Sequence, residues 1–199
     1  MKRLLISGFD PFGGETINPS WEAVKLLPDR IGAYELTRIE LPTIYGLAAE
    51  NMLKAAKELS PDAILCIGQA GGRRAITPEV VGINLREASI ADNAGTLYAG
   101  RAILPEGENA YFSTLPIREM VKSIGEAGIP AALSYSAGAF VCNDLLYTLL
   151  HAYRHTDLPV GFVHVPYLPE QVKDASTPSL PLETIVEALT VAIRALPQE

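Results

Sequence analysis

Short apolar runs alternate with longer amphipathic segments along the whole chain. The runs are rich in Leu, Ile and Val, as strands are, whereas the segments repeat their apolar positions every three to four residues, as helices do. The pattern predicts strands over residues 3–7, 34–40, 63–67, 79–85, 131–134 and 161–165. It predicts helices over residues 18–27, 45–59, 114–128, 142–155 and 182–196, the first with Asn18 as its N-cap and Pro19 in its first turn.

The order of these elements indicates the fold class. Strands that alternate with helices are typical of α/β proteins, and strands that are apolar on both faces belong in a mostly parallel sheet that helices cover on each side. At 199 residues the chain is long enough to bury one sizeable core. We therefore expect one three-layer α/β domain over residues 1–199, with the proline-rich stretch 167–181 as a loop before the C-terminal helix.

Composition narrows the possible partners. The formal charge is −7, from 16 Lys and Arg against 23 Asp and Glu, and no basic cluster is longer than the pair Arg73 and Arg74. This balance argues against nucleic acid and anionic membranes as partners. The N-terminal stretch MKRLLISGFD has too few apolar residues for a signal peptide, and no apolar run is long enough to span a membrane, so we expect a cytoplasmic protein.

The two cysteines differ in their sequence surroundings. Cys66 lies inside the apolar run AILCIG and is expected to be a small core residue. Cys142 follows the small-residue stretch SAGAF and opens a helix, where unpaired N–H groups and the helix dipole would stabilise a thiolate and lower its pKa. Position alone leaves two interpretations of Cys142 open, a poised nucleophile and a buried space-filler.

The chain has three histidines that could serve a thiol nucleophile as a base. His151 and His155 lie four residues apart on a predicted helix, but no third ligand and no HExxH glutamate is nearby, so we expect solvated side chains rather than a zinc site. His164 ends a predicted strand, and open α/β sheets build their sites at such ends. A hydrogen-bonded core histidine is the alternative for His164.

A third group would orient the imidazole and stabilise its charged form. Glu79 heads the predicted strand 79–85, and a carboxylate beside apolar residues needs a positive or hydrogen-bonding partner. An exposed charge after Pro78 is the alternative interpretation of Glu79.

Two glycine-rich stretches, GFDPFGG and GQAGGR, each follow a predicted strand, and we expect them to wall one site. Neither matches a dinucleotide or P-loop motif. They contribute two aromatic surfaces and one neutral amide, those of Phe9, Phe12 and Gln69. A phosphate site would need basic residues instead, and Arg73 alone keeps that option open.

Several segments together carry a family resemblance. In chain order they are GFDPFGG, NPSWE, GQAGGR, EVVGIN, TLPIREMV, GIPAALSYSAGAFVCND and FVHVPYLPEQ. In this order and over almost the whole chain they resemble the pyroglutamyl peptidase I family, also called the pyrrolidone-carboxylate peptidases. The resemblance implies a cysteine exopeptidase that removes N-terminal pyroglutamate from peptides through a thioester acyl-enzyme. It also implies no metal or cofactor, and a homotetramer.

The resemblance also assigns site residues. Cys142 matches the family's nucleophile, His164 its base and Glu79 the orienting acid, in agreement with the roles inferred from the residues themselves. A pocket for the pyroglutamyl ring corresponds to Phe9, Phe12, Gln69, Phe140 and Val141. Such a pocket suits a flat, uncharged lactam, which is best held by apolar walls and a few hydrogen bonds.

Two positions depart from the family pattern. Ser89 stands where many members carry an arginine near the oxyanion site, and Ala139 and Phe140 stand where the family has a threonine and an aromatic residue. Two other functions therefore remain open at this point. One is an inactive ligand-binding module on the same fold, and the other is a nucleoside-phosphorylase-like enzyme, which would require phosphate.

Overall fold

A six-stranded sheet forms the middle layer of the computed structural model, which describes residues 1–198. Its strand order is β2-β3-β1-β4-β8-β5. The strands are β1 (Lys2–Phe9), β2 (Arg30–Ile31), β3 (Tyr34–Leu41), β4 (Ala63–Gln69), β5 (Thr77–Pro78) and β8 (Val160–Val165). The central strands β3, β1, β4 and β8 run parallel, whereas the short edge strands β2 and β5 are antiparallel to their neighbours.

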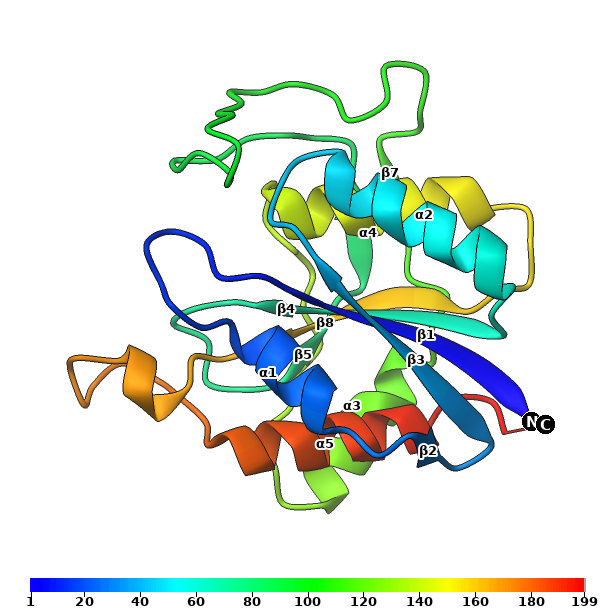
Figure 1. Ribbon diagram of the computed structural model, residues 1–199, viewed down its shortest axis with the longest axis vertical. Helices are drawn as coiled ribbons and strands as arrows, with labels where there is room; N and C mark the ends of the chain where they lie inside the picture. The colour runs from blue at the N-terminus through cyan, green and yellow to red at the C-terminus, as the bar shows by residue number, and fades with distance from the viewer. Residues whose placement is uncertain (199) are drawn as a thin grey trace.

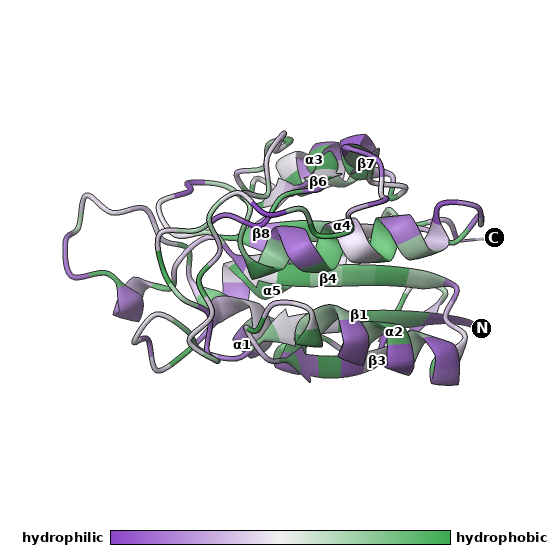
Figure 2. Cartoon of the chain, turned by 90° about the horizontal axis from the view of Figure 1, so that it is seen from above, coloured by the Kyte–Doolittle hydropathy of each residue, from purple (hydrophilic) through white to green (hydrophobic). Residues whose placement is uncertain are grey.

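Helices cover both faces of this sheet (Figure 1). One face carries α1 (Pro19–Leu26), α3 (Ile117–Glu126) and α5 (Leu182–Arg194), and the other carries α2 (Leu47–Leu59) and α4 (Val141–Tyr153). Successive side chains of a strand point to opposite faces, so Leu4 joins one core cluster and Leu5 the other. Figure 2 shows the apolar central strands between the helices. The predicted three-layer α/β fold is confirmed.

Helix starts follow the sequence signals. The Asn18 side chain caps α1 by accepting a hydrogen bond from the Ser20 N–H at 3.1 Å, and Pro19 is the first residue of that helix. α4 begins at Val141, so Cys142 lies in its first turn as predicted.

Two predicted strands need correction. The stretch 79–85 is not one strand: β5 ends at Pro78 in the large sheet, and β6 (Val81–Ile83) pairs with β7 (Ala110–Phe112) in a separate two-stranded sheet. Glu79 lies in the short connection between β5 and β6, and its N–H donates a hydrogen bond to the Phe162 carbonyl of β8. The stretch 131–134 makes only single bridges at its two ends. An apolar pattern indicates extended backbone but not which strand it pairs with.

The segment 167–181 contains one turn of 3₁₀ helix, η1 (Pro169–Gln171), and a bridge between Tyr167 and Ser179.

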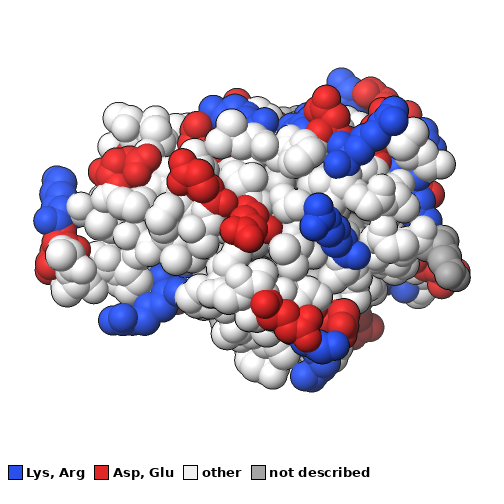
Figure 3. All heavy atoms as spheres, turned by 90° about the horizontal axis from the view of Figure 1, so that it is seen from below, with Lys and Arg blue, Asp and Glu red and all other residues white. Residues whose placement is uncertain are grey.

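Acidic and basic side chains are interspersed on the face that Figure 3 shows. No helix within residues 1–198 is both long and apolar enough to cross a membrane.

Candidate active site

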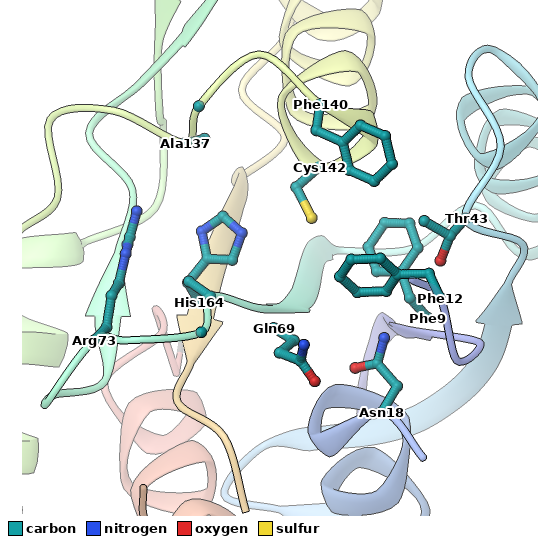
Figure 4. A pocket seen from close by; sticks show the side chains of 13 residues that line it. Phe9, Phe12, Asn18, Thr43, Gln69, Arg73, Ala137, Phe140, Cys142 and His164 are labelled. Atoms are coloured by element: carbon teal, nitrogen blue, oxygen red, sulfur yellow. The ribbon is translucent and has the colours of Figure 1, made fainter. Parts of the chain in front are cut away.

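A pocket of about 300 Å³ opens at the carboxyl ends of β1, β4 and β8 (Figure 4). Loops that follow parallel strands gather at this edge of a sheet, and both glycine-rich stretches contribute to the pocket wall, as predicted. The lining consists of Phe9, Phe12, Asn18, Thr43, Gln69, Ala70, Gly71, Arg73, Ala137, Gly138, Phe140, Cys142 and His164.

The sulfur of Cys142 rests on strand β4. The side chain is half-buried, and a Cβ atom added to Gly68 would lie only 2.9 Å from Sγ. A larger residue at position 68 would therefore displace the thiol. In the sheet, Gly68 pairs with His164, so the thiol lies above the strand next to the one that carries the imidazole.

His164 and Glu79 form a buried pair. The Nδ1 atom of His164 lies 2.7 Å from Oε1 of Glu79, and both side chains are almost fully shielded from solvent. Because a carboxylate only accepts hydrogen bonds, Nδ1 carries the proton and Nε2 is the free nitrogen of the neutral ring. In Figure 4 the sulfur of Cys142 points into the pocket, between the His164 ring on one side and the phenylalanine rings on the other. The structure thus brings the three catalytic candidates to one place.

Arg73 is a second partner of Glu79. Its Nη1 atom lies 2.7 Å from the same Oε1, and its Nη2 donates to the Ser136 carbonyl at 2.9 Å. The sequence suggested Arg73 only as a possible phosphate ligand. In the structure its charge is paired with the buried carboxylate, and its second nitrogen fastens the small-residue loop before α4.

Burial controls the charge states of the site. It raises the pKa of the Cys142 thiol to about 12, with the Glu79 charge acting in the same direction. Burial also lowers the pKa of His164, although Glu79 opposes this. For Glu79, burial acts to raise the pKa, but the hydrogen bonds with His164 and Ser134 and the positive charge of Arg73 outweigh it and lower the pKa. At neutral pH the site therefore holds a thiol, a neutral imidazole and a carboxylate.

The predicted lowering of the Cys142 pKa is therefore wrong. The position at the start of α4 is as expected, but the loss of water around the sulfur outweighs the helix N-terminus. Ionisation of this thiol requires a base that takes its proton.

Aromatic rings wall the opposite side of the pocket from the imidazole. The rings of Phe12 and Phe140 lie 5.9 Å apart, centroid to centroid, and Tyr45 packs edge-on against Phe140 at 5.3 Å. Phe9 lies deeper, 6.3 Å from Phe162. These are the spacings of tilted and edge-to-face aromatic contacts, which hold the rings in fixed orientations.

Two residues singled out from the sequence lie elsewhere. Val141 is fully buried in the core on the α2 and α4 side of the sheet, and its side chain does not line the pocket. Ser89 is exposed in the loop between β6 and β7 and does not line the pocket either.

The remaining thiol and histidines are structural or exposed. Cys66 is fully buried in β4, as predicted. His151 lies 3.0 Å from the Tyr111 hydroxyl through Nδ1, and His155 is exposed. In the part of the chain that the structure describes, no group of three or more His, Cys, Asp or Glu side chains could hold a metal ion.

The two residues after Cys142 hold its helix in place. Asn143 is fully buried and exchanges hydrogen bonds with the backbone of Ile83, while Asp144 pairs with Arg86 at 2.6 Å and accepts from the Gly46 N–H. The first turn of α4 is therefore fastened to two other segments, which fixes the place of the sulfur. These contacts join residues far apart in the sequence, so no local pattern predicts them.

Known proteins resemble this chain along its full length. A family model described as pyroglutamyl peptidase matches residues 2–199. The pyrrolidone-carboxylate peptidase of Alkaliphilus oremlandii is 49% identical over 196 residues, which cover 97% of this chain and 92% of that protein. For the pyrrolidone-carboxylate peptidase of Enterococcus faecalis the identity is 46%, with the same two coverages.

Solved structures give the same result. The crystal structure of pyroglutamyl peptidase I from Bacillus amyloliquefaciens is similar with a TM-score of 0.94 and 46% identity, covering 98% of this chain and 97% of that one. The pyrrolidone carboxyl peptidase from Thermococcus litoralis is similar with a TM-score of 0.93 and 33% identity, covering 98% and 93%.

Proposed function

The chain belongs to the pyroglutamyl peptidase family and is a pyroglutamyl peptidase, and we propose that Cys142 is its nucleophile, His164 its base and Glu79 the group that orients the base. One observation carries this proposal: the Glu79–His164 hydrogen bond of 2.7 Å lies beside the Cys142 thiol in a pocket whose far wall is aromatic.

The reaction divides into two acyl transfers. As Sγ of Cys142 attacks the carbonyl carbon of the pyroglutamyl residue, Nε2 of His164 takes the thiol proton. The imidazolium then gives that proton to the leaving amine, the C–N bond breaks, and a thioester remains on Cys142. A water molecule, deprotonated by His164, cleaves the thioester, which releases pyroglutamate and restores the thiol.

The start of α4 supplies the donor for the oxyanion. The N–H groups in the first turn of a helix have no acceptor within the helix, and Cys142 occupies that turn. Its N–H is therefore available to the oxygen that becomes negative next to its own sulfur. Ser89, which is exposed outside the pocket, has no part in this proposal.

The pocket suits an uncharged ring. None of the residues 1–198 that line it carries a carboxylate. Two acids could have turned toward the pocket, Asp10 and Asp92, but both accept hydrogen bonds from the backbone: Asp10 from the Thr43 N–H and Asp92 from the Tyr45 N–H. A protonated ring amine would therefore lie among aromatic rings without a counter-ion, which is costly.

A phosphate-dependent enzyme is a poorer account of this pocket. Among the described residues that line the pocket, Arg73 alone is a Lys or Arg, and its charge is already paired with Glu79. The inactive-module alternative required that Ser89 or another change disable the triad, and the candidate catalytic groups are arranged without Ser89.

We further propose a cytoplasmic location and a homotetramer. Both cysteines are unpaired in the structure, as expected in a reducing compartment. Large apolar side chains are exposed at Phe112 (75%) and Tyr135 (67%), which a second copy could cover. Light scattering on the purified protein measures the oligomeric state, and a monomer at micromolar concentration would contradict the tetramer.

Substrate discrimination tests the proposed function. We expect hydrolysis of a fluorogenic pyroglutamyl amide with kcat/KM about 10⁴-fold or more above that for the matching prolyl amide, because proline lacks the lactam carbonyl and carries a charged amine. The rings are similar in size, so the pair isolates charge and hydrogen bonding. Similar rates on both substrates, or no hydrolysis of the pyroglutamyl amide, would refute the proposal.

A further inference from the structure

Two consecutive hydrogen bonds lead from the loop after β8 into the pocket. The Leu168 N–H donates to Oε1 of Gln171 at 3.0 Å, and Nε2 of Gln171 donates to Oε1 of Gln69 at 2.9 Å. Gln171 is the last residue of η1 and does not line the pocket, whereas Gln69 ends β4 and does.

These two bonds determine which way both amides face. A backbone N–H is only a donor, so it must meet the oxygen of Gln171. The nitrogen of Gln171 then faces Gln69 and must meet an acceptor, which is the Gln69 oxygen. Each orientation follows from the one before it, starting from a backbone group that cannot be reversed.

The Gln69 oxygen accepts the hydrogen bond from Gln171, so the other polar group of the Gln69 side chain is its NH₂ group. The side chain is largely buried, with 9% of its surface exposed, and that surface lies in the pocket. In Figure 4 the nitrogen of Gln69 is drawn nearer to Cys142 than the oxygen is. The pocket thus presents an amide donor among apolar walls, which complements the carbonyl oxygen of a lactam ring.

We propose that Gln171 is a positioning residue for substrate specificity: it holds the Gln69 amide with its NH₂ group toward the lactam carbonyl. Without the Gln171 donor, the terminal bond of Gln69 can turn by half a rotation, because rotation about it is broad and nearly two-fold. The Gln69 oxygen would then face the lactam oxygen, and the two acceptors would repel each other. This inference rests on the proposed function, and it gives the proline-rich segment 167–181 a role in substrate binding.

A double-mutant cycle tests whether Gln171 acts through Gln69. Gln171→Met keeps the length of the side chain and removes its hydrogen bonds. In the otherwise unaltered protein, we expect it to lower kcat/KM for the pyroglutamyl amide by about 10-fold, mainly through a higher KM, because the contact is made in both the bound substrate and the transition state. In a Gln69→Ala background, the same change should cost less than about 2-fold.

A second variant preserves the local turn. Gln171→Glu keeps an acceptor for the Leu168 N–H but cannot donate to Gln69 when ionised, so it favours the reversed amide. We expect a loss of about 10²-fold in kcat/KM. The matched control is Gln198→Glu, the same change at a glutamine that bonds to Ala33 and to the end of α5, far from the pocket, and it should leave KM unchanged.

The rate of Cys142 alkylation by iodoacetamide shows whether the site is intact, since this reagent has no lactam ring. We expect an unchanged alkylation rate in both Gln171 variants together with the raised KM. Equal losses for Gln171→Met in both backgrounds, an unchanged KM for both Gln171 variants, or a KM loss that appears only together with slowed alkylation would overturn this inference. Absence of pyroglutamyl hydrolysis by the unaltered protein would instead overturn the proposed function.

Discussion

Cys66 and Cys142 are the two thiols of the chain, and they lie on the same side of the sheet. Burial raises the pKa of each to about 12. Their neighbours differ. Cys66 lies in the middle of β4, between Ser7 of β1 and Phe162 of β8, whereas Cys142 lies in the pocket, above the strand next to His164.

This comparison teaches that acidity does not distinguish the two thiols. At pH 7 both thiols are therefore almost entirely protonated. A resting thiolate is therefore not the reactive form, and proton transfer to a base has to accompany attack. His164, whose pKa burial lowers, is neutral and ready to accept that proton. The base beside Cys142 makes this thiol the nucleophile.

The largest effect is expected from exchanging the two thiols for alanine one at a time. Cys142→Ala should lower kcat/KM for a pyroglutamyl amide by about 10⁴-fold or more, because no atom remains to form the thioester. Cys66→Ala, the matched control, should change it by less than about 2-fold. Substantial activity in Cys142→Ala, or a comparable loss in Cys66→Ala, would break the distinction between the two sites.

Removing the base should make Cys142 resemble Cys66. His164→Ala is expected to lower kcat/KM by about 10³–10⁴-fold and to slow alkylation of Cys142 to nearly the rate of a buried thiol. His151→Ala removes an imidazole that contacts Tyr111 outside the pocket and should alter neither rate. Fast alkylation of Cys142 in the His164 variant would show that the thiol is reactive without its base.

A smaller effect is expected at Glu79. Glu79→Gln should lower kcat/KM by about 10²-fold, because the amide can still bond to the ring but cannot stabilise the imidazolium. The sign of the pH effect follows: Glu79 raises the pKa of His164, so removal of its charge lowers that pKa. Activity that requires neutral His164 should then persist to lower pH. An acid limb of the pH–rate profile that stays in place or moves upward would argue against this role.

The smallest catalytic effect is expected from a polar change at the buried thiol. Cys66→Ser should leave kcat unchanged within about 2-fold but lower the free energy of unfolding by about 1–3 kcal/mol, because a hydroxyl replaces a thiol in a water-free position. Urea denaturation followed by fluorescence measures the loss. An unchanged stability would mean that the hydroxyl finds a hydrogen-bond partner, and a large fall in kcat would mean that Cys66 contributes to the reaction.

Local signals in the sequence predicted much of the fold and the site. Apolar runs located β1, β4 and β8, and a cap residue followed by proline located the start of α1. Cys142 was predicted at a helix start and His164 near a strand end, and the parallel sheet brings these together. Such predictions succeed because the period and the terminal residues of an element are encoded within the element.

Features that depend on partners distant in sequence could not be predicted. The placement of residues 77–78 in the large sheet and of 81–83 in a separate one depends on where β8 and β7 lie, and the hydrogen bond from Arg73 to the Ser136 carbonyl joins residues 63 positions apart. The pKa of Cys142 was misjudged because helix position is visible in the sequence and burial is not. Gln171 had no signal of its own, since its importance comes from the groups that it joins, Leu168 and Gln69, with a longer hydrogen bond of 3.5 Å from Nε2 to the Ile17 carbonyl.

The central claim is that Cys142 carries the acyl group, and mass spectrometry of the acid-quenched reaction tests it most directly. During turnover of a pyroglutamyl ester, which acylates faster than an amide, intact-protein and peptide spectra should show one added pyroglutamyl group, located on the peptide that contains Cys142 and removed by hydroxylamine as a thioester is. His164→Ala should not accumulate it. A pyroglutamyl group on Cys66 or on another residue, or turnover by a Cys142→Ala variant, would contradict the account.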